Sequence, residues 1–350
     1  MTAPADSEAA TKASGPIKIL FVAGPGRVGS TLLGGMLGQI EGFFYVGELR
    51  VIWRRSIREN RPCGCGQTFA ECEIWREVLR EAFGDVSKLD LAPLLAAERK
   101  LSIYRTISGM FPSRRRKLYA SVDEYRDATT KLYHAIGKIT GCRVIVDTSH
   151  LPIYGKFLES LDGLDVRALH LTRDARAVAY SWRRVKVQPG GGEKSFEMRR
   201  PHPAETSMWW SLINMATERT WGPTHPHYLF LRYEDFIAEP QPWTRRIMQL
   251  VDESPPRLPF DGERSVVLGP THCVFGNPGR FKYGSVPLRS DDEWRGKLKR
   301  THRAAVAAVA WPWLKKYGYF KTPPADVRAD TAASANNTDA VSAAPNARND

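Results

Sequence analysis

The residues best suited to chemistry lie in one short run at positions 24–31, which combines three glycines with an arginine, a serine and a threonine. The apolar stretch before it is typical of a buried strand, and the apolar pattern after it is typical of a helix. Glycines let the backbone turn sharply and expose amide groups, and the helix presents its positive dipole end at Ser30 and Thr31. The run therefore predicts a cradle for an anion.

This run differs from the phosphate-binding loop of nucleotide hydrolases, GxxxxGK followed by serine or threonine. Gly24 and Gly29 match the glycines of that pattern, but Ser30 occupies the lysine position and the cation stands at Arg27. Because that lysine reaches the terminal phosphates, its displacement argues against ordinary magnesium-dependent ATP chemistry. The alternative interpretation is a glycine-rich turn that binds no ligand.

The segment GPGRVGSTLL, residues 24–33, resembles the 5'-phosphosulfate loop of the sulfotransferases that use 3'-phosphoadenosine 5'-phosphosulfate. The resemblance implies that no metal is required, because an arginine and a helix N-terminus supply the positive field. It also implies that the 5'-phosphosulfate is held by Arg27, Val28, Gly29, Ser30 and Thr31.

A second resemblance to that family lies in LHLTRDARAVAYSW, residues 169–182, where a strand ends in Arg-Asp and a helix carrying a serine follows. It implies that Arg173 and Ser181 bind the 3'-phosphate. Two helical turns cover roughly 12 Å, so the two residues share a ligand only if the chain bends between strand and helix. The alternatives are a surface salt bridge from Arg173 to Asp174 and a Ser181 hydroxyl bonded to its own helix.

The basic, glycine-containing stretch 275–294 resembles the late loop that closes over the 3'-phosphate in the same family. Asn277 and Arg280 match its positions, and Lys282 is a further candidate. The alternative is a solvated basic turn, because Gly, Pro and Asn are common in turns.

Sulfuryl transfer to a hydroxyl needs a base for the acceptor proton. We favour Glu48, which follows a short apolar strand at the place where relatives carry a glutamate, and the carboxyl ends of parallel strands are where ligands collect. Its alternative role is that of a helix N-terminal glutamate favoured by the dipole. The second candidate is His150, at the end of another strand, where many relatives have lysine.

Three cysteines, Cys63, Cys65 and Cys72, lie within ten residues of one another. Zinc would need a fourth ligand and commonly uses CxxC spacing, which is absent from this stretch. We therefore expect no metal site and interpret the segment as a reduced structural or acceptor-lining loop.

Strand-like runs at 17–23, 143–149, 166–173 and 227–234 are apolar on both faces and are followed by helical patterns. This order predicts an α/β fold with a central parallel sheet, helices on both faces and a P-loop-like strand–loop–helix unit.

The chain has 350 residues, of which 42% are hydrophobic, enough for a substantial core. We expect a single domain at 16–321 with a helical insertion at about 49–141. The small polar residues of 1–15 and 322–350 predict disordered tails.

The net charge of +13 favours an anionic ligand, and no apolar run reaches the roughly 20 residues of a membrane span. The N-terminal residues lack a secretory pattern, so we expect a cytoplasmic protein.

The predicted function is transfer of a sulfuryl group from 3'-phosphoadenosine 5'-phosphosulfate to a hydroxyl of a small metabolite, glycan or glycolipid. The alternatives are a P-loop kinase and a basic nucleic-acid-binding protein, although no specific nucleic-acid motif is present. The sequence leaves the acceptor and the oligomeric state open.

Overall fold

The structure is a computed structural model that describes residues 15–185, 187–189 and 195–320. The tails predicted at 1–15 and 322–350 lie, except for Gly15, outside the described residues.

A five-stranded parallel sheet forms the centre of the fold, with the strand order β2-β3-β1-β4-β7. This arrangement confirms the predicted α/β fold with a parallel sheet. The strands are β1 (Ile17–Ala23), β2 (Phe43–Gly47), β3 (Val144–His150), β4 (Leu164–Thr172) and β7 (Tyr228–Arg232).

Strand β1 lies in the middle of the sheet because both of its faces are apolar. Ile19 and Phe21 belong to the core on one face, whereas Leu20 and Val22 belong to the core on the other, and all four are fully buried. A strand buried on both faces needs a continuous run of apolar residues, and this run is the signal that predicted β1 from the sequence.

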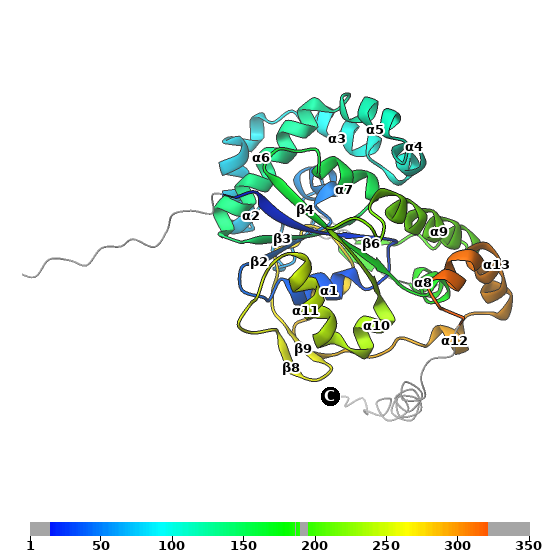
Figure 1. The fold of residues 1–350 in the computed structure, drawn as a ribbon. Coiled ribbons are helices and arrows are strands. Elements are labelled where there is room, and N and C mark those ends of the chain that lie inside the picture. Colours follow the sequence, from blue (N-terminus) through cyan, green and yellow to red (C-terminus); the bar gives the residue numbers. More distant parts are fainter. Residues whose placement is uncertain (1–14, 186, 190–194, 321–350) are drawn as a thin grey trace, which may run out of the picture.

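Helices cover both faces of the sheet (Figure 1). The core on the Phe21 side receives side chains from α2 (Glu73–Phe83), α3 (Leu91–Lys100), α6 (Asp123–Thr140) and α7 (Pro152–Leu158). The opposite core receives them from α1 (Ser30–Leu37), α8 (Ala175–Arg183), α10 (Tyr233–Ala238), α11 (Pro240–Leu250) and α13 (Arg300–Lys316). Helix α9 (Pro203–Thr220) contributes to both cores.

The segment between β2 and β3, which contains the stretch 49–141, is mainly helical in the structure. Short helical turns join its longer helices. These are the 3₁₀ turns η1 (Leu49–Val51), η3 (Val86–Lys88) and η4 (Ile103–Arg105), the π-helical η2 (Ile52–Arg58), and the helices α4 (Thr106–Gly109) and α5 (Pro112–Tyr119).

Two small antiparallel sheets were not predicted from the sequence. Strands β5 (Val187–Pro189) and β6 (Ser195–Glu197) form one, and β8 (Phe260–Gly262), β9 (Ser265–Leu268) and β10 (Gly284–Pro287) form the other. Strands of three or four residues are too short to show an apolar alternation. The chain continues through η5 (Pro278–Phe281) before β10 and through α12 (Trp294–Lys297) after it.

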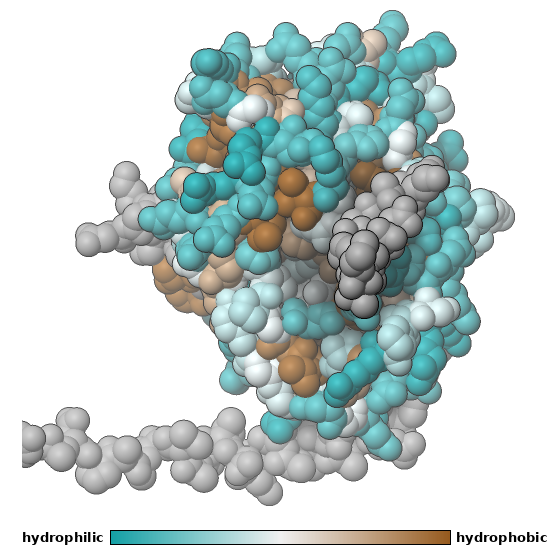
Figure 2. Space-filling model, turned by 90° about the vertical axis from the view of Figure 1, so that its left-hand side faces the viewer, coloured by the Kyte–Doolittle hydropathy of each residue, from teal (hydrophilic) through white to brown (hydrophobic). Residues whose placement is uncertain are grey.

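Among the helices that the structure describes, none combines the length and apolarity needed to cross a lipid bilayer. The face drawn in Figure 2 is largely hydrophilic, and its hydrophobic residues gather in small patches between polar ones. The apolar side chains pack mainly into the two cores, one on each face of the sheet.

The turn that joins β1 to α1 is enclosed by neighbouring strands and side chains. Gly24 has a φ of +132°, and a Cβ atom there would lie 2.1 Å from the carbonyl oxygen of Leu171 in β4. Gly29 has a φ of +93°, and a Cβ atom there would lie 2.4 Å from the ring of Tyr233. Only glycine fits both positions without displacing a neighbour.

We expect Gly24→Ala to lower the free energy of unfolding by about 2–5 kcal/mol, because it adds a strained φ and a clash with an immobile backbone carbonyl. Gly26→Ala is the matched control in the same loop, since its Cβ would meet the Trp182 ring at an ordinary 3.5 Å. We expect it to cost less than about 1 kcal/mol. Urea unfolding of both variants measures the difference, and equal losses would show that the turn is not constrained at Gly24.

Candidate active site

A cavity of about 430 Å³ opens at the carboxyl edge of the parallel sheet. Four strands end there: β1 leads into the glycine loop, β2 into Glu48, β3 ends with His150, and β4 leads into Arg173. The predicted site residues that line this cavity are Arg27, Gly29, Ser30, Thr31, Glu48, His150, Arg173, Ser181, Asn277 and Arg280.

Val28 does not line the cavity. Its side chain is fully buried in the core on the α1 side of the sheet. Its backbone amide is therefore the group that could contact a ligand in this loop.

A second hollow, of about 540 Å³, lies on α13, away from the strand ends. Among the described residues, its wall contains no charged side chain that could hold an anion. Its lining residues are Ala307, Ala308, Val309, Trp311, Pro312 and Phe320.

The start of α1 is open to a ligand on its cavity side. Gly29 is the N-cap of the helix, no side chain caps the first turn, and that turn contains no acidic residue. The first amide groups of a helix lack intrahelical partners and carry its positive dipole end. The sequence predicted an anion cradle at this helix start, and Ser30 and Thr31 are among the residues that line the cavity there.

Arg27 has a left-handed φ of +70°, and its side chain lines the cavity. Its guanidinium stacks at 4.8 Å over the Trp182 ring, and one terminal nitrogen contacts the sulfur of Met198 at 3.0 Å. Its Nε is buried without a hydrogen-bond partner among the described residues. Burial lowers the pKa of Arg27, and the nearby Glu48 acts in the opposite direction. A guanidinium held mainly by an aromatic ring and a sulfur atom retains capacity for an anionic ligand.

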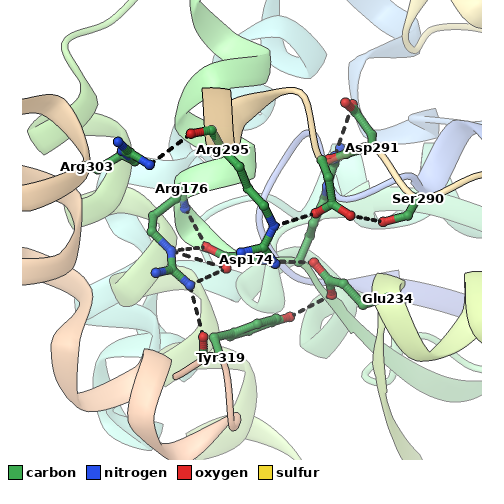
Figure 3. Close-up of polar contacts among 10 residues, drawn as sticks. Asp174, Arg176, Glu234, Ser290, Asp291, Arg295, Arg303 and Tyr319 are labelled. Atoms are coloured by element: carbon green, nitrogen blue, oxygen red, sulfur yellow. Dashed lines mark hydrogen bonds and ion pairs between the residues drawn. The ribbon is translucent and has the colours of Figure 1, made fainter. Parts of the chain in front are cut away.

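A network of polar groups around the buried Asp174 fixes the turn between β4 and α8 (Figure 3). Asp174 caps α8 by accepting a hydrogen bond from the Arg176 amide at 2.8 Å, and the Arg176 side chain also pairs with it. The Asp174 amide donates to Glu234 at 3.0 Å, and Tyr319 donates to the same carboxylate at 3.1 Å. The chain bends at this turn, because Arg173 and Ser181 line the same cavity. Sharing of one ligand by these two residues requires such a bend.

Arg173 is buried against the wall of the cavity. Its guanidinium lies 4.8 Å over the Tyr233 ring and pairs with Asp291 at 3.0 Å, and its carbonyl accepts a hydrogen bond from Trp210 at 2.9 Å. The alternative interpretation, a salt bridge to Asp174, does not occur, because Asp174 is paired with Arg176.

The late loop packs directly on the glycine loop. The Asn277 amide donates to the Thr31 hydroxyl at 3.4 Å, and the Asn277 side chain accepts from the Gly279 amide at 3.1 Å. Arg280 is buried, and its terminal nitrogens donate to the carbonyls of Gly276 at 3.2 Å and Pro62 at 2.9 Å. Arg280 is therefore partly engaged in holding the loop, and Lys282 also lines the cavity.

Glu48 stands where β2 ends, with its backbone amide bonded to the Phe275 carbonyl at 3.3 Å. It precedes η1 but makes no side-chain cap, so the dipole-capping alternative has no hydrogen bond to support it. Burial raises the pKa of its carboxyl group, whereas Arg50, Arg280 and Arg27 lower it. A carboxyl with a raised pKa beside a cavity suits proton transfer near neutral pH.

His150 has a left-handed φ of +66°, and its Nε2 lies 3.1 Å from the Ser30 hydroxyl. Its Nδ1 is buried without a hydrogen-bond partner among the residues that the structure describes. Burial lowers the pKa of His150 to about 4, with a further contribution from Arg50. The imidazole is therefore neutral at pH 7, and it lies against the glycine loop.

Sequence reasoning missed Trp182 and Asp291, which both lie in the cavity wall. Trp182 directly follows Ser181, which was a predicted site residue, but nothing in the sequence linked it to Arg27. Asp291 lies 118 residues from Arg173 and carries no local signal. The expected acceptor-lining cysteines Cys63, Cys65 and Cys72 are not among the residues that line this cavity.

The family model described as the sulfotransferase domain matches residues 19–262, more than half of the chain. No match is found among the curated proteins.

Several solved structures are similar to this one at low sequence identity. The sulfotransferase domain from the Synechococcus PCC 7002 olefin synthase is 20% identical, with a TM-score of 0.49, and the match covers 88% of this chain and 97% of that one. The sulfotransferase domain from the curacin biosynthetic pathway is 16% identical, with a TM-score of 0.46 and coverages of 84% and 96%. Sulfotransferase STF9 from Mycobacterium avium is 14% identical, with a TM-score of 0.39 and coverages of 69% and 65%.

The family model covers β1, the glycine loop, the turn after β4 and the strand β7, and it ends before the late loop at 275–294. The chain belongs to the sulfotransferase domain family.

Proposed function

We propose that this protein transfers a sulfuryl group from 3'-phosphoadenosine 5'-phosphosulfate to a hydroxyl of a small metabolite, glycan or glycolipid. One observation carries the proposal: a single cavity joins a lysine-free glycine loop to a second arginine at the end of β4. Two separate cationic positions suit a nucleotide that carries a phosphosulfate at one end and a phosphate at the other.

The 5' end of the donor would bind at the start of α1. Backbone amides of the first turn, the Ser30 and Thr31 hydroxyls and Arg27 would surround its phosphosulfate. Arg27 and the helix dipole would stabilise the charge that develops on the leaving phosphate oxygen. The proposed reaction would not need the P-loop lysine, because it does not require transfer of a terminal phosphate.

The 3'-phosphate would bind at Arg173 and Ser181, with the loop of Asn277 and Arg280 beside it. Arg173 pairs with Asp291 in the structure, so a phosphate must compete with that carboxylate. The phosphate carries more charge and offers more acceptor oxygens, which favours the exchange.

Glu48 would act as the base. It accepts the proton of the acceptor hydroxyl while that oxygen bonds to sulfur, and the bond from sulfur to the phosphate oxygen breaks with its electron pair left on the phosphate. His150 is the less suitable base, because its pKa is lowered to about 4 by burial and its Nε2 is engaged with Ser30.

The direct test of the function is incubation of the protein with ³⁵S-labelled donor and a cell extract, followed by identification of any labelled product heavier by one sulfuryl group. A parallel incubation with ATP and magnesium tests the kinase alternative. Phosphorylated products together with no sulfated product would overturn the proposal.

Arg173→Ala should weaken binding of adenosine 3',5'-bisphosphate by 10- to 150-fold, because it removes a charge-assisted contact of about 1.5–3 kcal/mol. Affinity for a nucleotide without the 3'-phosphate should barely change. Isothermal titration calorimetry with both nucleotides measures the two effects.

Asp291→Asn is the matched control, because it removes the same ion pair from the other side. It should retain or tighten binding of the bisphosphate, since the competing carboxylate is gone. Equal weakening in both variants, or equal loss for both nucleotides, would make Arg173 a structural residue.

Glu48→Gln should lower kcat by roughly 100- to 10,000-fold and leave donor affinity close to that of the wild type, because it keeps the shape and removes the base. The ionised carboxylate is the active form and its pKa is raised. The wild-type rate should therefore rise with pH along a limb displaced above the range of an ordinary glutamate, and this limb should vanish in the variant.

His150→Gln is the comparison for this experiment and should keep the rising limb of the pH profile. The assignment of the base is wrong if Glu48→Gln retains most turnover while His150→Gln abolishes it.

A further inference from the structure

The three cysteines of the segment after β2 lie beside a histidine that is distant in the sequence. The ligand atoms of Cys63, Cys65, Cys72 and His272 all lie within 4.8 Å of one another. The Nδ1 atom of His272 lies 3.2 Å from the Cys72 sulfur and 4.0 Å from the Cys63 sulfur. The two segments are 200 residues apart, so the sequence shows the cysteines but not their partner.

This set has the size and chemistry of a tetrahedral zinc site. Zinc–sulfur bonds of about 2.3 Å and zinc–nitrogen bonds of about 2.0–2.1 Å place tetrahedral ligand atoms roughly 3.5–3.8 Å apart. The observed separations bracket that range, and all three cysteines are free thiols. We propose that Cys63, Cys65, Cys72 and His272 bind one Zn²⁺ ion.

The backbone around the cysteines forms a compact turn that holds their sulfur atoms together. The Cys63 amide donates to the Gln67 carbonyl at 2.8 Å, and the Gly66 amide donates back to the Cys63 carbonyl at 2.9 Å. Pro62 and Thr68 pair across the base of this turn. The chain then returns to Cys72 at the N-terminus of α2.

His272 is also fixed in place by its neighbours. Its carbonyl accepts a hydrogen bond from the Trp75 indole at 2.7 Å, and its ring stacks on Phe44 with centroids 6.2 Å apart and an interplanar angle of 13°. These contacts hold the ring with Nδ1 toward the sulfur atoms. A preformed orientation of this kind is what a metal-binding histidine needs.

The site would be structural, not catalytic. Four protein ligands complete a tetrahedron and leave no position for water or substrate. Cys63 and Cys72 are buried, and none of the four ligands lines the cavity described above. The ion would therefore take no direct part in the sulfuryl-transfer reaction, for which no metal is invoked.

The ion would fasten the helical insertion to the late loop of the cavity. Gly64 donates to the Cys273 carbonyl at 2.9 Å, and Tyr283 donates to the Gly64 carbonyl at 2.6 Å. Arg280 reaches the Pro62 carbonyl from the cavity side. Loss of the metal should thus loosen one wall of the cavity and weaken adenosine 3',5'-bisphosphate binding indirectly.

The first test is the metal content of the full-length protein purified from zinc-supplemented cells. Inductively coupled plasma mass spectrometry should find about one zinc per chain in the wild type. Cys72→Ala and His272→Ala should lose it. Cys142→Ser is the matched control, because Cys142 is a free cysteine outside the cluster, and this variant should keep its zinc.

A spectroscopic test works on the wild type alone, so it does not depend on whether the variants fold. Zinc is removed with a chelator and Co²⁺ is added to the wild-type chain. The cobalt-loaded chain should show intense ligand-field bands and sulfur-to-cobalt charge-transfer bands. Added zinc should abolish these bands. It should also raise the melting temperature above that of the metal-free chain.

The proposal is overturned if wild-type protein contains no zinc and its cobalt spectrum is that of the hydrated ion. It is equally overturned if mass spectrometry of the freshly purified protein finds Cys63 and Cys72 joined in a disulfide.

Discussion

The site depends on the turn between β1 and α1, where the chain passes from a strand that is buried on both faces into a helix. The constraint is that two positions of this turn have no room for a side chain. Gly24 lies against the Leu171 carbonyl of the neighbouring strand, and Gly29 lies against the Tyr233 ring. Because both positions exclude a Cβ atom, the first amides of α1 are brought to the edge of the sheet. The position of these amides is thus a consequence of how tightly β1, β4 and the segment after β7 pack.

The parallel sheet turns this local feature into a site by collecting the ends of its strands. Glu48, His150 and Arg173 come from three different strands, yet they line one cavity because parallel strands all end at the same edge. The network of Asp174, Arg176 and Glu234 then sets the direction in which α8 leaves that edge. Strain and buried charge are concentrated here, as is expected where function competes with stability.

Much of this could be predicted from the sequence because the signals are local. The strands at 17–23 and 166–173, the glycine loop and the Arg-Asp turn each occupy one continuous segment, so their residue types and spacing carry the information. The fold then brings these segments to one cavity, where their proposed roles can be tested.

The features that were missed are those that depend on contacts between distant segments. The pairing of Arg173 with Asp291 and the approach of His272 to the cysteines span more than 100 residues each. The sequence also did not show that Val28, in the middle of the glycine loop, turns its side chain into the core. The small sheet of β8, β9 and β10 has strands too short and too exposed to leave a pattern.

The crystal structure of the protein with adenosine 3',5'-bisphosphate tests the central claim most directly, because it locates both ends of the nucleotide at once. We expect the 5'-phosphate within hydrogen-bonding distance of the amides and hydroxyls of Ser30 and Thr31. We expect the 3'-phosphate against Arg173 and Ser181, with the ion pair to Asp291 broken. A nucleotide bound in the reverse direction, or outside this cavity, would contradict the proposed site.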